Sequence, residues 1–161
     1  MNATVTSSPE LQIQSGNSRD LDSVIEIMNS AFDERFGEAW TRSQCAGILP
    51  MPGVRLVVAR FGDGRAAGFA LYRTISDEAE LLLLAVSPEF RRRGIGKMLL
   101  DEFLDQARDS GAGRVHLEVR EGNPAVIMYR LAGFSLVGRR HKYYHGRTGG
   151  EFDALTLSRD I

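Results

Sequence analysis

Hydrophobic positions follow strand or helix spacing along most of the chain from residue 11 onward. Alternation of apolar and polar residues around Leu11 and Ile13 predicts a short first strand. Asn17 or Ser18 can cap a helix that follows, whose one face carries Leu21, Val24, Ile25 and Met28, and Phe32 extends this stripe. The other predicted helices cover residues 41–49, 94–110 and 124–132. The other predicted strands cover residues 54–60, 66–74, 79–86, 114–119, 134–144 and 151–158.

This order of elements predicts an α/β fold with one mixed sheet and helices on both of its faces. The segments 79–86 and 114–119 enclose a helix, so they are expected to pair in parallel. The run 79–86 is almost continuously apolar, which is typical of a strand buried on both faces. Residues 1–9 are small and polar and predict a flexible leader, followed by a single domain over 10–161.

Composition and charge narrow the classes of function. The chain has 161 residues with 43% hydrophobic and 25% charged content, as expected of a globular protein in water. No apolar run approaches the length of about 20 residues that a membrane span needs. One cysteine, Cys45, allows no internal disulfide and fits the cytoplasm. A net charge of −1 argues against broad nucleic-acid binding, so an anion site must be local. We expect a monomer or weak dimer with no membrane or direct nucleic-acid partner.

One local anion site is predicted where the strand 79–86 leads into Arg91-Arg92-Arg93-Gly94-Ile95-Gly96-Lys97 and a helix. The first N–H groups of a helix lack internal partners, and its dipole favours an anion there. Glycine allows close approach of phosphate oxygens to the backbone. A Walker A loop or a dinucleotide fingerprint would need glycine or hydroxyl residues that this segment lacks. The simpler interpretation is a solvated basic helix start.

These residues resemble the cofactor motif of the GNAT acetyltransferases. The resemblance rests on Leu84-Ala85-Val86, Pro88 and Arg91-x-x-Gly94-x-Gly96, and continues through Leu117-Glu118-Val119-Arg120, Asn123, Tyr129 with Gly133-Phe134, Arg139-Arg140, Tyr143-Tyr144 and Asp153-Ala154. It covers residues 11–158, is strongest over 79–155, and is most similar to the RimI branch of the family.

The resemblance implies the GNAT fold, a central sheet of about seven strands splayed between the fourth and fifth. It also implies acetyl-CoA as cosubstrate, held by Leu84, Ala85, Val86, Arg91, Arg92, Arg93, Gly94, Ile95, Gly96, Lys97 and Asn123. Asn123 and Tyr129 are six positions apart, where the family usually has seven. Either Asn123 still reaches the cofactor from a tighter turn, or Gly122 takes its place.

The acid and the base of the reaction are also implied by the resemblance. Glu118 matches the general base and Tyr129 the general acid that protonates the leaving thiolate. Read from the residues alone, Glu118 is as well explained as a solvated strand carboxylate paired with Arg120 or Arg114. Tyr129 is as well explained as an amphipathic core residue.

The resemblance implies that Tyr143 and Tyr144 hold the acceptor peptide. Phe32 and Trp40 are candidates for the opposite wall, although residues of this kind are more often part of the core. Adjacent strand residues point to opposite faces, so only one of the two tyrosines should line the groove. The glycine-rich turn 146–150 is a candidate flap. The histidines lack metal-ligand spacing, so no metal is expected. Cys45, His116 and Asp153 occur in the order of an acyl-enzyme triad, although nothing local supports that role.

The expected activity is direct acetyl transfer, in a ternary complex, to the N-terminal α-amine of a protein. By resemblance, the substrate is the N-terminal alanine of ribosomal protein S18. One alternative is a GNAT enzyme that acetylates a small amine or an internal lysine. An alternative of another class is a non-catalytic module that binds ribosomal RNA through residues 91–93 and 139–142.

Overall fold

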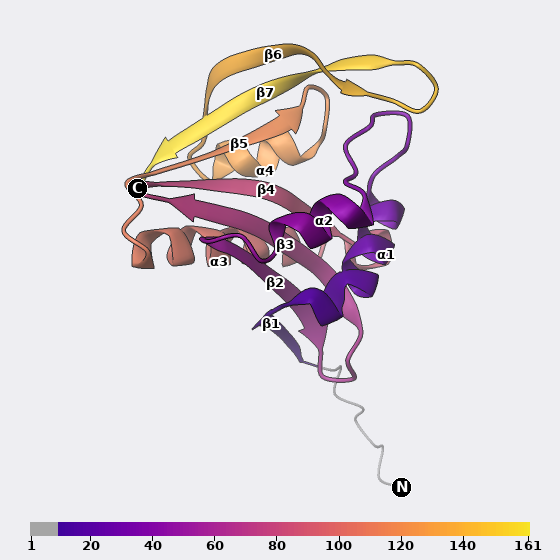
Figure 1. Ribbon diagram of the computed structural model, residues 1–161, viewed down its shortest axis with the longest axis vertical. Helices are drawn as coiled ribbons and strands as arrows, with labels where there is room; N and C mark the ends of the chain where they lie inside the picture. The colour runs from indigo at the N-terminus through magenta and orange to yellow at the C-terminus, as the bar shows by residue number, and fades with distance from the viewer. Residues whose placement is uncertain (1–9) are drawn as a thin grey trace, which may run out of the picture.

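All seven predicted strands pair into one mixed sheet in the computed structural model, which describes residues 10–161 (Figure 1). The strands are β1 (Leu11–Ser15), β2 (Val54–Phe61), β3 (Ala66–Ile75), β4 (Glu78–Val86), β5 (Arg114–Arg120), β6 (Ser135–His145) and β7 (Glu151–Asp160). The helices are α1 (Leu21–Ala31), α2 (Arg42–Ile48), α3 (Ile95–Asp109) and α4 (Ala125–Leu131), with short 3-10 turns η1 (Ser18–Asp20) and η2 (Pro88–Phe90). The predicted leader, 1–9, lies outside the described residues.

The helix ends follow from local chemistry. Thr41 caps α2, because its hydroxyl accepts from the Gln44 N–H at 3.2 Å and the Gln44 side chain accepts from the Thr41 N–H at 2.8 Å. The prediction that Phe32 continues the helical stripe of α1 was wrong. Phe32 does not extend the helix but has extended backbone angles (φ −101°, ψ 125°). The chain therefore leaves the helix before Phe32 and continues as loop 32–41 toward the turn between β6 and β7 (Figure 1).

The strand order is β1-β2-β3-β4-β5-β7-β6, and β4 and β5 form the expected parallel pair. Their pairing runs only from Glu78 opposite Arg114 to Leu81 opposite Leu117. Immediately afterwards the register between β3 and β4 shifts around Leu82. Such a bulge bends its strand, so the second half of β4 diverges from β5. The splay expected between the fourth and fifth strands is confirmed.

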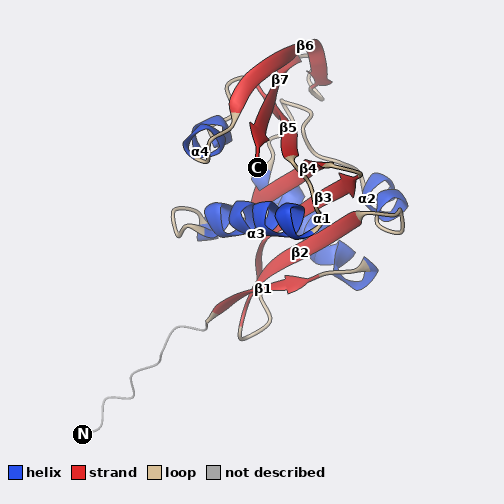
Figure 2. Cartoon of the chain, turned by 90° about the vertical axis from the view of Figure 1, so that its left-hand side faces the viewer, coloured by secondary structure: helices blue, strands red, loops and turns tan. Residues whose placement is uncertain are grey.

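Two hydrophobic clusters fill the space on the two faces of the sheet. One joins α3 and α4 to the sheet, and the other joins α1 and α2 to the opposite face. Figure 2 shows α3 lying across the strands. Within β4, Ala79 and Leu81 belong to the first cluster, whereas Leu83 and Ala85 belong to the second. The bulge between them accounts for this change of face.

The expectation that β4 is buried on both faces is only partly met. Alternate residues are fully buried, while Leu82, Leu84 and Val86 stay partly exposed. The divergence of β5 removes the neighbouring strand that would have covered them, and a cleft lies there instead.

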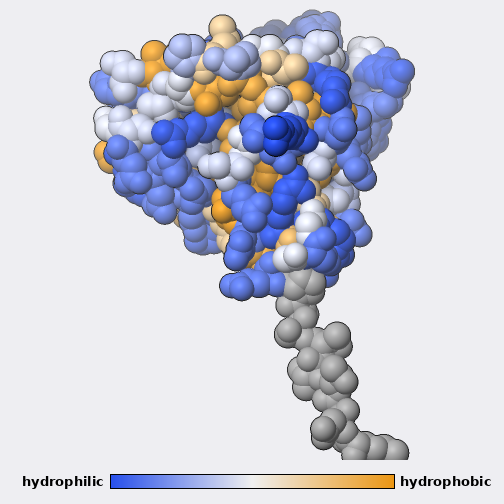
Figure 3. Space-filling model, turned by 60° about the horizontal axis from the view of Figure 1, so that its bottom comes forward, coloured by the Kyte–Doolittle hydropathy of each residue, from blue (hydrophilic) through white to orange (hydrophobic). Residues whose placement is uncertain are grey.

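The outer surface is mostly hydrophilic in the view of Figure 3, with hydrophobic side chains gathered in one central area and bordered by polar ones. Among residues 10–161, no helix is long and apolar enough to cross a membrane.

Candidate active site

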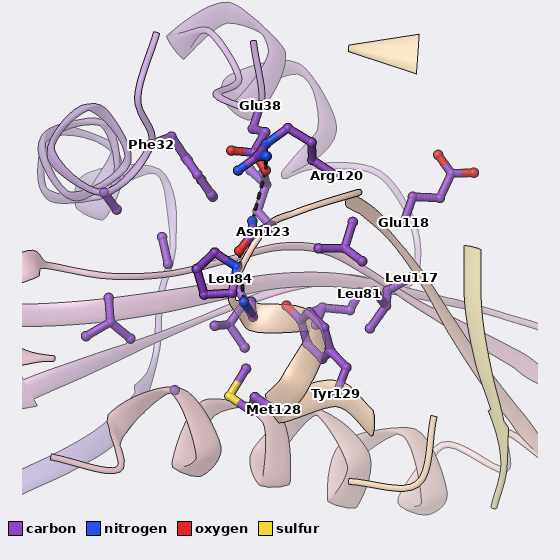
Figure 4. Close-up of a pocket in the computed structure, with 18 of the residues that line it drawn as sticks. Phe32, Glu38, Leu81, Leu84, Leu117, Glu118, Arg120, Asn123, Met128 and Tyr129 are labelled. Atoms are coloured by element: carbon purple, nitrogen blue, oxygen red, sulfur yellow. Dashed lines mark hydrogen bonds and ion pairs between the residues drawn. The ribbon is translucent and has the colours of Figure 1, made fainter. Parts of the chain in front are cut away.

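A cleft of about 790 Å³ opens where β4 and β5 separate. One wall is the second half of β4 with the start of α3, and the other is the end of β5 with α4. Loop 32–41 and the β6 strand complete its rim. The cleft thus brings together four separate stretches of the chain, and many of its side chains are drawn in Figure 4.

The predicted anion loop lies at one end of this cleft. Gly94 is the N-cap of α3 and has a left-handed backbone (φ 76°), which glycine adopts without steric cost. Arg92 is also left-handed, with φ 63°. The Met98 N–H donates to the Gly94 carbonyl at 3.0 Å, so the preceding amides at the start of the helix lack intrahelical partners. Concave backbone of this kind, at the positive end of a helix, suits a phosphate group.

The three consecutive arginines are not equivalent. Arg91 and Arg92 line the cleft, and Arg91 also donates to the Ala31 carbonyl at 3.0 Å. Arg93 is not among the lining residues, and its guanidinium lies 5.5 Å from the centre of the Phe90 ring. A cofactor contact for Arg93 stays a prediction, and its position favours a role in packing.

The β4 wall presents a backbone edge as well as side chains. Leu84, Ala85 and Val86 all line the cleft, together with Ile95, Gly96 and Lys97 of α3. Because β5 pairs with β4 only as far as Leu81, the edge of β4 beyond that residue has no strand partner on this side. Unpaired backbone groups of this kind can pair with an added extended chain.

Tyr129 reaches the cleft from α4. Its side chain is 6% exposed, and its ring meets Phe134 edge to face at 6.0 Å between centroids. Figure 4 shows its hydroxyl end turned toward the middle of the cleft. Burial, with a smaller contribution from the Glu38 carboxylate, raises the pKa of Tyr129 well above its usual value of 10. The hydroxyl therefore keeps its proton at neutral pH and is available as a donor.

Glu118 lies on β5 at the side of the cleft away from the anion loop (Figure 4). Its side chain is 14% exposed and its carboxylate is 2.6 Å from Arg140 Nε on β6. Glu118 is therefore paired with Arg140 and not with Arg120 or Arg114, the two arginines that were suggested because they are close to it in sequence. Those arginines pair with Glu38 and Asp160, respectively.

Both tyrosines of β6 line the cleft, so the expectation that only one would do so was wrong. Arg140 lies opposite Ala154, and Tyr144 lies opposite Phe152. Three residues of β6 (141–143) therefore lie opposite a single residue of β7. Lys142 within this bulge is left-handed (φ 51°). The bulge breaks the strict alternation of strand side chains, and the rings of Tyr143 and Tyr144 meet edge to face at 5.0 Å.

Loop 32–41 forms the opposite rim and places Phe32 and Trp40 in the cleft lining. Its outer part contacts the turn between β6 and β7, as Figure 1 shows at the upper right. The Arg147 N–H donates to the Glu34 carbonyl at 3.0 Å, and the two side chains pair at 2.9 Å. A Cβ atom added at Gly146 would collide with the Arg35 carbonyl. The turn 146–150 is thus packed against the loop in this structure, and we call this contact the roof; its residues lie beside the cleft lining and not within it.

The inner part of the same loop holds a buried ion pair that sequence reasoning missed. Glu38 Oε1 is 3.2 Å from Arg120 Nε, and both side chains are 9% exposed. Glu38 also accepts from the Asn123 amide at 2.9 Å. No local pattern points to Glu38, because its partner Asn123 is 85 positions away.

Asn123 lines the cleft, but its amide is engaged within the protein. Its oxygen accepts from the Ala125 N–H at 2.9 Å and its nitrogen donates to Glu38. Gly122 is not among the lining residues. The shortened turn therefore keeps Asn123 at the cleft and turns its side chain toward loop 32–41.

The remaining candidates lie elsewhere. Cys45 is buried beneath α1 and outside the cleft lining, and burial raises the pKa of its thiol, which disfavours a nucleophilic thiolate. His116 faces Glu78 and Glu80, and His141 contacts Asp153. Within residues 10–161, no group of three or more His, Cys, Asp or Glu side chains is arranged to hold a metal ion.

The basic cluster 139–142 is neutralised by carboxylates. Arg139 contacts both Glu121 and Asp153, and Lys142 pairs with Glu151 at 3.3 Å. A hydrogen bond from the Lys142 N–H, together with the Arg139 contact, holds the pKa of Asp153 below its usual range. Cations that are already paired make a poor phosphate-binding surface, which weighs against the RNA-binding alternative.

Comparison with known proteins agrees with this geometry. Residues 21–134 match the model of the acetyltransferase (GNAT) family. The chain is 44% identical over 128 residues to the N-alpha-acetyltransferase RimI of Mycobacterium tuberculosis, covering 76% of this chain and 77% of that protein. It is 40% identical over 100 residues to the [ribosomal protein bS18]-alanine N-acetyltransferase of Salmonella typhimurium, covering 62% of this chain and 67% of the relative.

Solved structures give the same result. The ribosomal-protein-S18-alanine N-acetyltransferase of Escherichia coli superposes with a TM-score of 0.82 at 28% identity, over 94% of each chain. Arabidopsis thaliana NAA60, solved in complex with acetyl-CoA, shares the fold with a TM-score of 0.80 at 20% identity, over 94% of this chain and 99% of its own. With the family model spanning most of its length and a splayed β4–β5 cleft at its centre, the chain belongs to the GNAT family of acetyltransferases.

Proposed function

We propose that this protein transfers an acetyl group from acetyl-CoA to the N-terminal α-amine of a protein, and that its substrate is the N-terminal alanine of ribosomal protein S18. The observation that carries the proposal is the cleft itself, which joins an anion-binding helix start to a buried, protonated tyrosine. The substrate assignment is supported by the names of the relatives from Salmonella typhimurium and Escherichia coli.

The residues at the anion end fit acetyl-CoA. The α3 amides around Gly94 and Gly96 would hold the pyrophosphate, with Arg91 and Arg92 adding charge. The free edge of β4 at residues 84–86 would pair with the extended pantetheine arm. Held in this way, the thioester would lie between β4 and β5, near Tyr129.

Transfer then needs a neutral amine, a new N–C bond and a proton for the departing sulfur. The amine nitrogen attacks the thioester carbonyl carbon, and the C–S bond breaks. Tyr129 gives its proton to the sulfur, and the proton released by the amine passes to Glu118, directly or through water. An α-amine has a pKa of about 7.7–8.0, so roughly a tenth is already neutral at pH 7. The Glu118 carboxylate, which is paired with Arg140, can therefore serve as the base.

The roof of the cleft favours a chain end over an internal side chain. Glu34 pairs with Arg147 there, and the Arg35 carbonyl lies where a Cβ atom at residue 146 would be, so these contacts would limit access across the rim. A free N-terminus can enter such a site end-on, between Phe32 and the two tyrosines. A lysine inside a folded segment would have to bring its backbone past the roof.

Mass spectrometry with paired peptides tests the proposal. One peptide carries the N-terminal sequence of S18 with a free α-amine, and the matched control carries the same sequence with a blocked α-amine and one internal lysine. The protein should acetylate the first and leave the second unmodified. Acetylation of the lysine alone, or of a small polyamine but neither peptide, would instead identify one of the alternative GNAT activities.

A further inference from the structure

The ion pair between Glu38 and Arg120 connects two parts of the cleft that are separate in sequence. Glu38 belongs to loop 32–41, which carries the acceptor wall, and Arg120 is the last residue of β5. Asn123 lies in the turn between β5 and α4, the helix that carries Tyr129. Figure 4 shows the three side chains converging on one side of the cleft.

The arrangement is more buried than most ion pairs of this protein, and the 3.2 Å contact between Glu38 Oε1 and Arg120 Nε is an ion pair without hydrogen-bond geometry. Each of the two charged side chains is 9% exposed, whereas the Glu34–Arg147 side chains are 71% and 76% exposed. The guanidinium carbon of Arg120 lies 3.6 Å from the centre of the Phe36 ring, also in loop 32–41. Phe36 in turn meets Phe152 of β7 at 5.2 Å between centroids. A buried pair of this kind fixes geometry strongly, because removing one partner leaves a buried charge without compensation.

The Asn123 amide is committed on both sides. Its oxygen holds the first turn of α4 through the Ala125 N–H, and its nitrogen holds Glu38. The side chain is therefore built to join loop 32–41 to α4. The charge of Glu38 also faces the acid site, since this carboxylate contributes to the raised pKa values of both Tyr129 and Tyr144.

We propose that Glu38, Arg120 and Asn123 form a latch that positions the acceptor loop 32–41 relative to Tyr129, and that Asn123 acts through this latch and not as a ligand of acetyl-CoA. The three are positioning residues, and the kinetic part of the proposal rests on the proposed acetyltransferase function. We therefore expect the same contact to set the position of both the acceptor loop 32–41 and the general acid Tyr129. Acetyl-CoA is held by separate elements, the α3 start and the β4 edge.

Three variants test the latch. Glu38→Gln removes the charge that Arg120 faces. Asn123→Ser keeps a side-chain oxygen that can cap α4 but is too short to reach Glu38. Asp20→Asn is the matched control, because it breaks the half-buried pair with Arg60, which lies outside the cleft lining.

The latch variants should impair the reaction with the peptide but not the binding of acetyl-CoA. Glu38→Gln and Asn123→Ser should each lower kcat/KM for the S18 peptide by about tenfold and leave the Kd of acetyl-CoA within about twofold of the parent value. The double variant should be little worse than the worse single variant, since both break one contact. Asp20→Asn should change neither quantity. A Kd for acetyl-CoA that rises in Asn123→Ser but not in Glu38→Gln, with additive effects, would overturn the proposal.

Hydrogen exchange provides a readout that does not depend on activity. Backbone amides of residues 32–41 should exchange about tenfold faster in Glu38→Gln and Asn123→Ser, and at the parent rate in Asp20→Asn. Unchanged exchange in both latch variants would refute the latch even if the enzyme is active. If the parent protein acetylates no peptide while exchange behaves as expected, the proposed function fails and the latch stands. If Glu38→Gln does not fold, Asn123→Ser decides both measurements.

Discussion

The two ends of the cleft are built in different ways. The anion end comes from one continuous segment, β4 to the start of α3, and offers mainly backbone groups held by Gly94 and the register shift at Leu82. The acceptor end is assembled from loop 32–41, β5, α4 and β6, and offers side chains held by long-range contacts. Under the proposed function, a backbone motif would bind acetyl-CoA, while side chains from several separate elements would recognise the acceptor.

The largest effect is expected from a variant that impairs the chemical step but not the binding of acetyl-CoA. Tyr129→Phe keeps the ring packed against Phe134 but removes the proton donor. We expect kcat to fall by about 10²–10⁴-fold, the usual contribution of general acid catalysis, with the Kd of acetyl-CoA unchanged. Single-turnover kinetics and titration calorimetry measure the two quantities. A kcat within twofold of the parent would remove Tyr129 from the reaction.

The second largest effect is expected at the anion end of the cleft, which offers mainly backbone groups. Gly94→Ala places a Cβ in open space but at φ 76°, so its cost is conformational. A left-handed non-glycine residue costs about 1–2 kcal/mol, and relaxation of the loop should weaken acetyl-CoA binding by about tenfold. The KM of the peptide should not change.

Gly64→Ala is the control for that variant. Gly64 is also left-handed with open space around a Cβ, but it lies in the β2–β3 turn and outside the cleft lining. It should lose similar stability in thermal unfolding while binding acetyl-CoA normally. Equal loss of acetyl-CoA affinity in both variants would mean that general destabilisation, and not the anion loop, explains the result.

The pH dependence tests the acid and the acceptor together. The pKa of Tyr129 is raised, so its proton-donating form persists as pH rises and is lost only well above pH 10. The neutral fraction of an α-amine with pKa near 8 rises from about a tenth at pH 7 to about nine tenths at pH 9. Peptide kcat/KM should therefore rise about ninefold over this interval and then level off. A decline between pH 8 and 10, with the protein still folded, would contradict the acid assignment.

The smallest effect concerns the roof. Arg147→Ala removes an exposed ion pair with Glu34, and such pairs contribute at most about 1 kcal/mol. The KM of the peptide should rise by about two- to threefold, with acetyl-CoA affinity unaffected. Arg108→Ala, which removes an exposed pair on α3, should leave both unchanged. Acceptance of lysine peptides by Arg147→Ala would sharpen the role of the roof in selecting chain ends.

The same contrast explains what could be predicted from the sequence. The anion loop is local, so a buried strand, two glycines and a helix start predict it. The role of Tyr129 came from the family resemblance, in which Gly133-Phe134 fixes its position in the motif. The acceptor side depends on features without a local signal: the end of α1 before Phe32, and a β6 bulge carried by the left-handed Lys142, which is not a glycine. The Glu38–Arg120 pair needs the whole fold before its partners meet.

The most direct test of the account is a crystal structure with a bisubstrate conjugate, in which coenzyme A is joined through the acetyl carbon to the α-amine of a peptide that begins with alanine. We predict pyrophosphate oxygens on the backbone amides between Arg92 and Lys97, and the sulfur within hydrogen-bond distance of the Tyr129 hydroxyl. The peptide should leave between Phe32 and the Tyr143–Tyr144 pair. A conjugate whose sulfur lies beyond reach of Tyr129, or whose peptide leaves on the other side of the sheet, would contradict the central claim.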